Sequence, residues 1–151
     1  MKAKQMEHPN KVYVNRKFNC SATQLFDWLI KPELIAQWFG PKDWSVENIQ
    51  TDVKVGGQFS IELRRSDSRK FFLEGKYIEI KPPTNLVFSF HYIGLSPAPP
   101  DSMITIRFKQ LAPNESQLFL TQEFESMPQD MATRTAAWQH MLETLGQLVQ
   151  I

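Results

Sequence analysis

The C-terminal segment from Asp130 to Val149 constrains the fold more than any other part of this chain. Its apolar residues recur at intervals of three and four positions, the spacing of one face of an α-helix. They are Trp138, Met141, Leu142, Leu145, Leu148 and Val149. Most of the preceding chain reads as strands, which need a cover for one face. We therefore expect one long helix to lie across a curved antiparallel sheet, with any binding site between the two.

Seven segments ahead of this helix have the apolar and polar alternation of strands. They are Lys11–Phe18, Trp44–Val53, the stretch around Phe59–Leu63, Phe71–Ile80, Leu86–Tyr92, Ile104–Phe108 and Leu118–Phe124. In the second segment the alternation slips between Val46 and Ile49, which predicts a bulge. The side that the first strand buries stays open at this stage. Short connections between consecutive strands favour antiparallel pairing.

Two short helices are expected between the first and second strands. Ser21 and Gln24 have the spacing of a capping box, in which each side chain bonds to the backbone N–H of the other residue. Pro32 suits the first turn of the second helix, because its missing N–H would have no partner there anyway. Gly40-Pro41 ends that helix. The predicted fold class is therefore α+β, with two layers.

Size and composition limit what kind of protein this is. A chain of 151 residues is most simply one domain, so we assign residues 1–10 to a flexible tail and 11–151 to a single domain. The net charge of +1 gives no excess that favours nucleic acid. No apolar run reaches the roughly 18–20 residues that span a bilayer, and the N-terminus lacks the apolar centre of a signal peptide.

The single cysteine, Cys20, cannot form an internal disulfide, which fits a reducing compartment. We therefore expect a cytoplasmic protein with no nucleic-acid or membrane partner, either a monomer or a homodimer. Cys20 precedes a helix, where a thiol pKa can be lowered, but an inert and partly buried thiol is the favoured interpretation.

Four motifs occur in order along the chain: Lys31–Pro41 with its Pro-Glu, Trp and Gly-Pro; Val55–Phe59 with Gly-Gly; Gly75–Pro83 running into Leu86; and Ala137-Trp138 with Leu142 and Leu145. In this order they resemble the START-like helix-grip superfamily, and more narrowly the family named after the activator of the Hsp90 ATPase. The resemblance covers about Val12 to Val149. It implies a seven-stranded sheet wrapped on a long C-terminal helix, with an apolar pocket beneath that helix.

The chain departs from the family pattern in two respects. Gln122 stands where many relatives carry a histidine near the end of the seventh strand, so a role for that histidine does not transfer. The eponymous co-chaperones also carry a separate N-terminal domain that does most of their work on Hsp90. These 151 residues contain no counterpart of it, which weighs against a chaperone role.

The predicted pocket lining consists mostly of aromatic side chains on elements that should converge between sheet and helix. It comprises Trp38, Trp44, Phe59, Tyr77, Phe88, Phe90, Tyr92, Gln122, Trp138, Met141 and Leu142. The same side chains could simply fill the core, and a core without a cavity larger than a few water molecules would exclude binding. An inward Gln122 is either satisfied by backbone or water, which is favoured, or offered to a ligand.

No catalytic or metal-binding group is expected. His91 and His140 should face solvent, His8 lies in the tail, and the three histidines lack any metal-ligand spacing. Glu74 and Glu79 lie on opposite faces of one strand, so they cannot act together as acid and base. Arg64, Arg65, Arg69 and Lys70, with Asp67 among them, form a solvated hairpin tip.

The favoured function is a non-catalytic module that binds a small apolar or amphipathic ligand, without a cofactor. Tyr77 or Gln122 would orient the ligand, and the segments Gly94–Pro100 and Trp38–Trp44 would form the mouth of the pocket. One alternative is a protein-interaction module related to Hsp90 activators, which predicts an exposed apolar patch. A second alternative is an enzyme of the cyclase type, which needs a titratable group inside the pocket.

Overall fold

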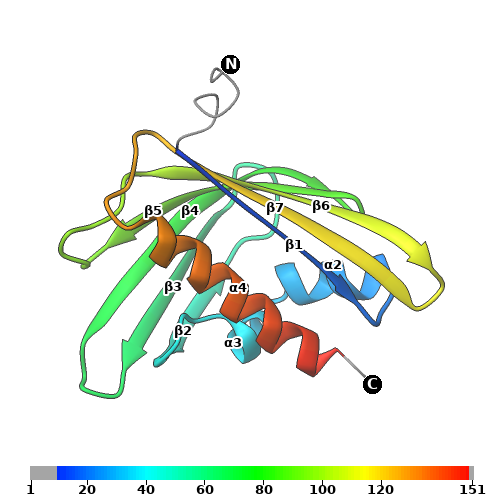
Figure 1. Cartoon of the computed structure of the whole chain (residues 1–151), viewed down its shortest axis with the longest axis horizontal. Coiled ribbons are helices and arrows are strands. Elements are labelled where there is room, and N and C mark those ends of the chain that lie inside the picture. The colour runs from blue at the N-terminus through cyan, green and yellow to red at the C-terminus, as the bar shows by residue number, and fades with distance from the viewer. Residues whose placement is uncertain (1–9, 150–151) are drawn as a thin grey trace.

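The computed structural model describes residues 10–149 (Figure 1). Along the chain lie β1 (Lys11–Phe18), α2 (Ala22–Ile30), α3 (Pro32–Trp38), β2 (Trp44–Thr51), β3 (Gln58–Arg65), β4 (Lys70–Lys81), β5 (Asn85–Ile93), β6 (Ser102–Ala112), β7 (Glu115–Phe124) and α4 (Met131–Leu148). All seven strands form one sheet in the order β1-β7-β6-β5-β4-β3-β2. Every neighbouring pair is antiparallel, as expected.

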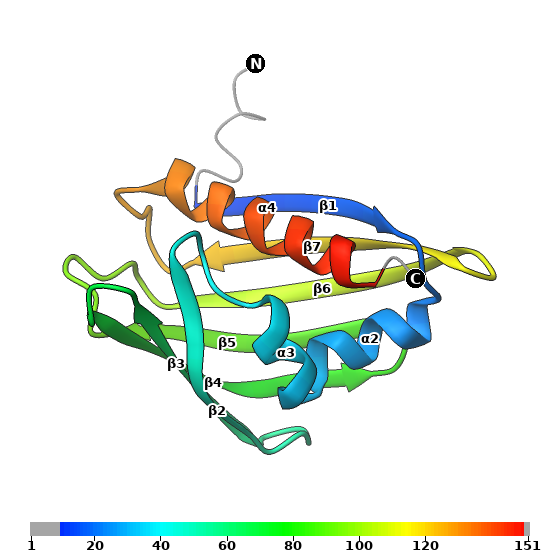
Figure 2. The ribbon, with the colours of Figure 1, turned by 90° about the horizontal axis from the view of Figure 1, so that it is seen from below.

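The sheet curls into a half-barrel, and the three helices lie on its hollow side (Figure 2). The long helix α4 packs next to β1, at one edge of the sheet. The short helix α3 lies against β2 at the other edge and also contacts α4, while α2 reaches β6 and β7. This arrangement is the two-layer helix-grip fold that the sequence predicts.

The strand patterns agree with the sequence and settle the open question about β1. Val12 and Val14 are buried and Tyr13 is exposed, because Val12 pairs with Gln122 and Val14 with Leu120 on β7. The bulge in β2 is confirmed, since its register shifts between Val46 and Asn48. This strand ends at Thr51, earlier than predicted.

Of the expected tail, residues 1–9 lie outside the described residues. Asn10, which the sequence analysis assigned to the tail, belongs to the folded part. Its carbonyl oxygen accepts a hydrogen bond of 3.0 Å from the backbone N–H of Phe124, and its side-chain amide donates to the carbonyl oxygen of Phe124. These bonds continue the pairing of β1 with β7 by one residue.

The short helices begin and end where their sequence signals stand. The backbone N–H of Gln24 donates to the Ser21 hydroxyl over 3.1 Å, and the Ser21 N–H donates to the Gln24 side chain over 3.2 Å. Both halves of the capping box are therefore present. Pro32 opens α3, and Trp38 is its last residue.

The predicted apolar stripe of α4 faces the sheet. Trp138, Met141, Leu142 and Leu145 are buried, and Leu145 has no exposed surface. Near the end of the helix, Gly146 has no side chain, and a β-carbon there would lie 2.9 Å from Nε of Arg16 on β1. The glycine thus lets the arginine lie close against the last turn of α4.

Candidate functional site

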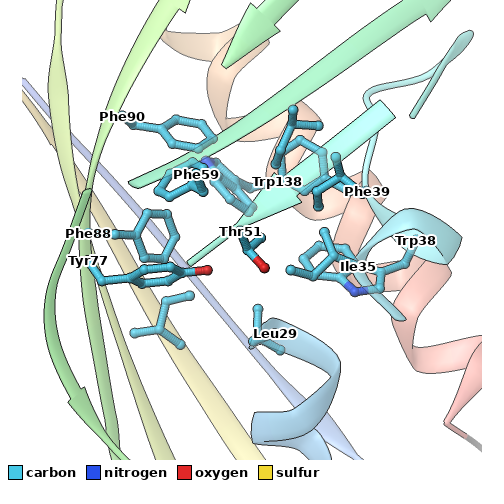
Figure 3. Close-up of a pocket in the computed structure, with 13 residues that line it drawn as sticks. Leu29, Ile35, Trp38, Phe39, Thr51, Phe59, Tyr77, Phe88, Phe90 and Trp138 are labelled. Carbon is cyan, nitrogen blue, oxygen red and sulfur yellow. The ribbon is translucent and has the colours of Figure 1, made fainter. Parts of the chain in front are cut away.

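A small apolar cavity lies between the sheet and the short helices (Figure 3). It encloses about 40 Å³, room for a few water molecules, since one water needs roughly 10–15 Å³. Its walls come from α2, α3, α4 and strands β2 to β6. The lining residues are Leu29, Ile35, Trp38, Phe39, Ile49, Thr51, Phe59, Ile61, Tyr77, Phe88, Phe90, Ile106 and Trp138.

Several predicted pocket residues meet at this cavity, and the others lie elsewhere. The cavity is lined by Trp38, Phe59, Tyr77, Phe88, Phe90 and Trp138, whereas Trp44, Tyr92, Gln122, Met141 and Leu142 do not line it. Leu142 is buried in the core, and the sulfur of Met141 accepts a hydrogen bond of 3.2 Å from the backbone N–H of Gly40. Trp44 packs edge-on against Phe71, with ring centres 4.8 Å apart.

Gln122 is fully buried, and its amide bonds to other side chains. Its Nε2 donates to the Ser102 hydroxyl over 2.9 Å and to the Tyr92 hydroxyl over 3.1 Å. Its Oε1 accepts the indole N–H of Trp138 over 2.8 Å. The amide therefore bonds α4 to the sheet, which agrees with the structural role that the sequence analysis favoured. Its partners, however, are side chains instead of backbone or water.

Tyr77 is the polar side chain that points most plainly into the cavity. It is only 4% exposed, and its hydroxyl is directed toward the side chain of Thr51 (Figure 3). Within residues 10–149 this hydroxyl has no hydrogen-bond partner. Burial raises the pKa of Tyr77 to about 12, so the phenol stays protonated at neutral pH and can donate a hydrogen bond.

The backbone and ring of Tyr77 are both held firmly. Its N–H donates to the carbonyl of Gly57 over 2.9 Å, and its carbonyl accepts the N–H of Gly56 over 2.8 Å. Its ring lies 5.5 Å from that of Phe59 and 6.3 Å from that of Phe88. The turn between β2 and β3 thus fixes the direction in which the phenol points.

Phe39, which the sequence analysis did not select, lies at the centre of the aromatic wall. Its ring stands edge-on to Trp38, Trp138 and Phe90, at 5.6, 6.0 and 6.4 Å between ring centres. Phe39 directly follows the last residue of α3, where helical spacing no longer indicates which way a side chain points. Ile61 and Ile106, also missed, were visible as inward positions of alternating strands.

Other candidate groups lie away from the cavity. His91 faces outward and pairs with Asp101, with 2.9 Å between Nδ1 and Oδ1. Burial raises the pKa of Cys20, opposite to the direction in which a helix N-terminus would move it. At the hairpin tip, Arg65 and Arg69 both pair with Asp67 at the surface. Within residues 10–149 no three His, Cys, Asp or Glu side chains are placed to share a metal ion.

The fold defines a helix-grip protein of the START-like class. A family model described as activator of Hsp90 ATPase homolog 1-like protein matches residues 19–150, and the chain belongs to this family. The search among curated proteins gave no significant match. No helix within residues 10–149 combines the length and the hydropathy needed to cross a membrane.

Solved structures share the whole fold at low sequence identity. Protein CV1439 from Chromobacterium violaceum is 21% identical, with a TM-score of 0.83 over 95% of this chain and 99% of that chain. Protein NE0264 from Nitrosomonas europaea is 20% identical, with a TM-score of 0.77 over 93% and 94%. The AHSA1 protein SPO3351 from Silicibacter pomeroyi is 17% identical, with a TM-score of 0.75 over 91% and 96%.

Proposed function

We propose that this protein binds a small, mainly apolar molecule in the cavity beneath α3 and α4. The proposal rests on the position of Tyr77. This buried phenol has no protein partner among residues 10–149, and it is directed into an apolar space. A ligand oxygen or nitrogen that accepts from this hydroxyl would give it a hydrogen-bond partner and fix the orientation of the ligand.

The space in this structure holds only a few water molecules, the size at which the sequence analysis excluded binding to a rigid core, so the proposal requires one wall to move outward. Pockets that hold drug-sized ligands span roughly 300–1,000 Å³. The wall best suited to move is β2 with α3, because β2 pairs with β3 alone among the strands of residues 10–149. Its inward residues Ile49 and Thr51 are only half-buried, whereas Ile61 on β3 is buried.

The chemistry of the cavity supports binding rather than proton transfer. Its described lining residues carry no carboxylate, imidazole or amine. Tyr77 is the lining residue with a titratable side chain, and its raised pKa makes the phenol a donor rather than a base at neutral pH. Affinity would then come from apolar burial, and Tyr77 and Thr51 would form hydrogen bonds with one polar group of the ligand.

Native mass spectrometry of protein purified without organic extraction tests the proposal, because it reports any bound mass directly. Titration with the neutral apolar dye N-phenyl-1-naphthylamine tests the cavity itself. We expect bound dye to move the indole N–H resonance of Trp38, which lines the cavity and donates to the carbonyl of Trp28 over 2.9 Å.

Two substitutions of Thr51 give a matched pair for this titration. Thr51→Phe should block the cavity and abolish dye binding, whereas Thr51→Val keeps the side-chain shape and should retain it. Tyr77→Phe should weaken a ligand that accepts a hydrogen bond by roughly five- to tenfold. The proposal fails if no bound mass appears and the dye neither moves the Trp38 resonance nor responds to Thr51→Phe.

A further inference from the structure

A second, larger hollow opens on the surface beside α4 and is separate from the cavity under the helices. It is a groove of about 360 Å³, within the size range of small-molecule sites. It lies between α4, the connection that leads from α3 into β2, and the connection after β5. We call it the α4 groove. Its lining residues are Pro41, Lys42, Trp44, Phe71, Leu95, Thr133, Arg134, Ala136, Ala137 and His140.

The α4 groove has an apolar body. Trp44 and Leu95, both half-buried, and the buried Phe71 line it. On the helix side stand Ala136 and Ala137, whose single methyl groups leave the hollow open. A flat hydrocarbon body could lie here against the Trp44 indole, which provides a large apolar surface.

The polar groups of the α4 groove carry one sign of charge. Lys42 and Arg134 are cations, His140 adds an imidazole, and no Asp or Glu is among the described residues that line it. The nearest pairing is with the residue that precedes α4, where Nη2 of Arg134 lies 3.3 Å from the Asp130 carboxylate. An anionic group in the groove would therefore meet attraction from the residues around it.

Among these residues, Arg134 gives the strongest indication of an anionic ligand. Its side chain is only 13% exposed, and its guanidinium lies over the Tyr92 ring at 5.5 Å. Its buried Nε has no hydrogen-bond partner within residues 10–149. A guanidinium has five N–H donors. This one bonds to the Tyr92 hydroxyl and pairs with Asp130, and its Nε still has no partner among the described residues. A carboxylate would supply acceptors of matching geometry.

We infer that the α4 groove binds a small molecule that combines a flat apolar body with a carboxylate. The apolar body would lie between Trp44, Leu95 and the alanines of α4, and the carboxylate would face Arg134 and Lys42. The volume favours a compound of about two fused rings, since larger ligands need larger pockets. This inference does not depend on a ligand in the inner cavity, because the two sites have no described lining residue in common.

Two probes of nearly the same shape test the inference: the anion 2-naphthoate and the neutral 2-naphthamide. We expect naphthoate to bind about tenfold more tightly, since hydrogen bonds with a charged partner are stronger than neutral ones. The indole N–H resonance of Trp44, assigned with Trp44→Phe, should move on titration, and that of Trp38 should stay in place. Movement at Trp38 alone would assign the probe to the inner cavity and overturn the inference.

Substitutions of the cations identify the source of the selectivity. Lys42→Gln should weaken naphthoate about two- to threefold, because this lysine is exposed and screened by solvent. Arg134→Gln should weaken it about tenfold and leave naphthamide nearly unchanged. Lys109→Gln is the matched control, because it removes an exposed cation from β6 at a different surface hollow.

The thermal midpoint of each variant is measured first, because Arg134 also packs on Tyr92. If Arg134→Gln does not fold, Lys42→Gln and the comparison of the two probes still decide the question. Equal affinity for naphthoate and naphthamide, or an equal loss with Lys109→Gln and Lys42→Gln, would overturn the inference. So would a groove that binds an acidic peptide but neither naphthalene compound.

Discussion

The indole N–H of Trp138 on α4 donates to the side-chain oxygen of Gln122 on β7 over 2.8 Å, with both residues buried. The same amide donates to Ser102 on β6 and Tyr92 on β5. One glutamine therefore joins the long helix to three adjacent strands. In a fold gripped by its last helix, this amide specifies where along the sheet the helix rests.

Replacing Gln122 by leucine should destabilise the protein by about 2–3 kcal/mol. The substitution leaves the buried N–H of Trp138 without an acceptor, and an orphaned buried polar group costs about 1–3 kcal/mol. The branched side chain must also fit a site shaped by a linear amide. Urea denaturation measures the change in the free energy of unfolding.

A double-mutant cycle with Trp138→Phe isolates the bond between the two side chains. We expect a coupling energy of about 1–2 kcal/mol, since the effects of substituting two residues in direct contact on the free energy of unfolding are not additive. Gln117→Leu is the control on the same strand, because Gln117 bonds to Asn15 at the surface. It should change stability by less than about 0.5 kcal/mol. If the losses of stability from Gln122→Leu and Trp138→Phe simply add in the double variant, the role of Gln122 as the link to α4 is contradicted.

Tyr77 should make the protein less stable at alkaline pH. Burial raises its pKa in the folded state from 10.0 to about 12, so the folded protein retains this proton while the unfolded chain loses it. The contribution of the Tyr77 hydroxyl to the free energy of unfolding is therefore fully present below pH 10. It is lost as the pH rises toward 12. The loss should be roughly 2–3 kcal/mol, because each tenfold difference between the two ionisation constants is worth about 1.4 kcal/mol.

Comparison with Tyr77→Phe separates this effect from the titration of lysines and the other tyrosines. The variant keeps the ring and has no phenolic proton, so its free energy of unfolding should fall less between about pH 9 and pH 11.5. Urea denaturation at several pH values gives both curves. Parallel curves for the two proteins would show that the Tyr77 hydroxyl titrates as in water.

Gly75→Ala should be severely destabilising. A β-carbon at Gly75 would lie 1.9 Å from the carbonyl oxygen of Ser89 and 2.7 Å from Cζ of Phe59. Because the nearer atom belongs to the backbone of β5, the strands must separate to make room. We expect a loss of about 3 kcal/mol or more, measured by thermal denaturation.

The control for this prediction is Gly56→Ala. Gly56 has φ +85 and no atom within 4 Å of the position of an added β-carbon. The cost there is conformational alone, about 1–2 kcal/mol. Equal losses at the two positions would mean that β4 and β5 are not as close at Gly75 as the structure has them.

Gly146→Ala should leave stability unchanged or raise it by up to about 1 kcal/mol. Alanine is favoured over glycine inside a helix by about that amount. The added methyl group would meet the end of the Arg16 side chain, 2.9 Å from Nε, and this flexible group can shift. A clear loss in the thermal midpoint would show that Arg16 is held in place against the last turn of α4.

Much of the fold follows from local patterns in the sequence. The period of the strands identified the inward side chains of β3, including Phe59 and Ile61, because a half-buried strand alternates strictly. The stripe on α4 and the capping box at Ser21 were equally visible. These features depend on residues close together along the chain, which is why they can be read without knowing the register of the sheet.

The site was less predictable because it depends on how distant elements meet. Trp44 and Phe39 flank the same connection, yet Phe39 turns into the cavity and Trp44 into the α4 groove. Between them the backbone passes through left-handed φ values at Gly40 and Asp43, which no periodicity describes. The partners of Gln122 likewise required the register that aligns Gln122 with Ile104 on β6.

The half-barrel never closes, because β1 and β2 remain apart at its two ends. Five strands lie between them, and β2 with α3 completes the enclosure at one edge of the sheet. Substitutions in β2 and α3 can therefore alter the size of the interior while the pairing among the other six strands is preserved. For protein engineering, β2 and α3 are the elements to redesign first in order to enlarge the cavity.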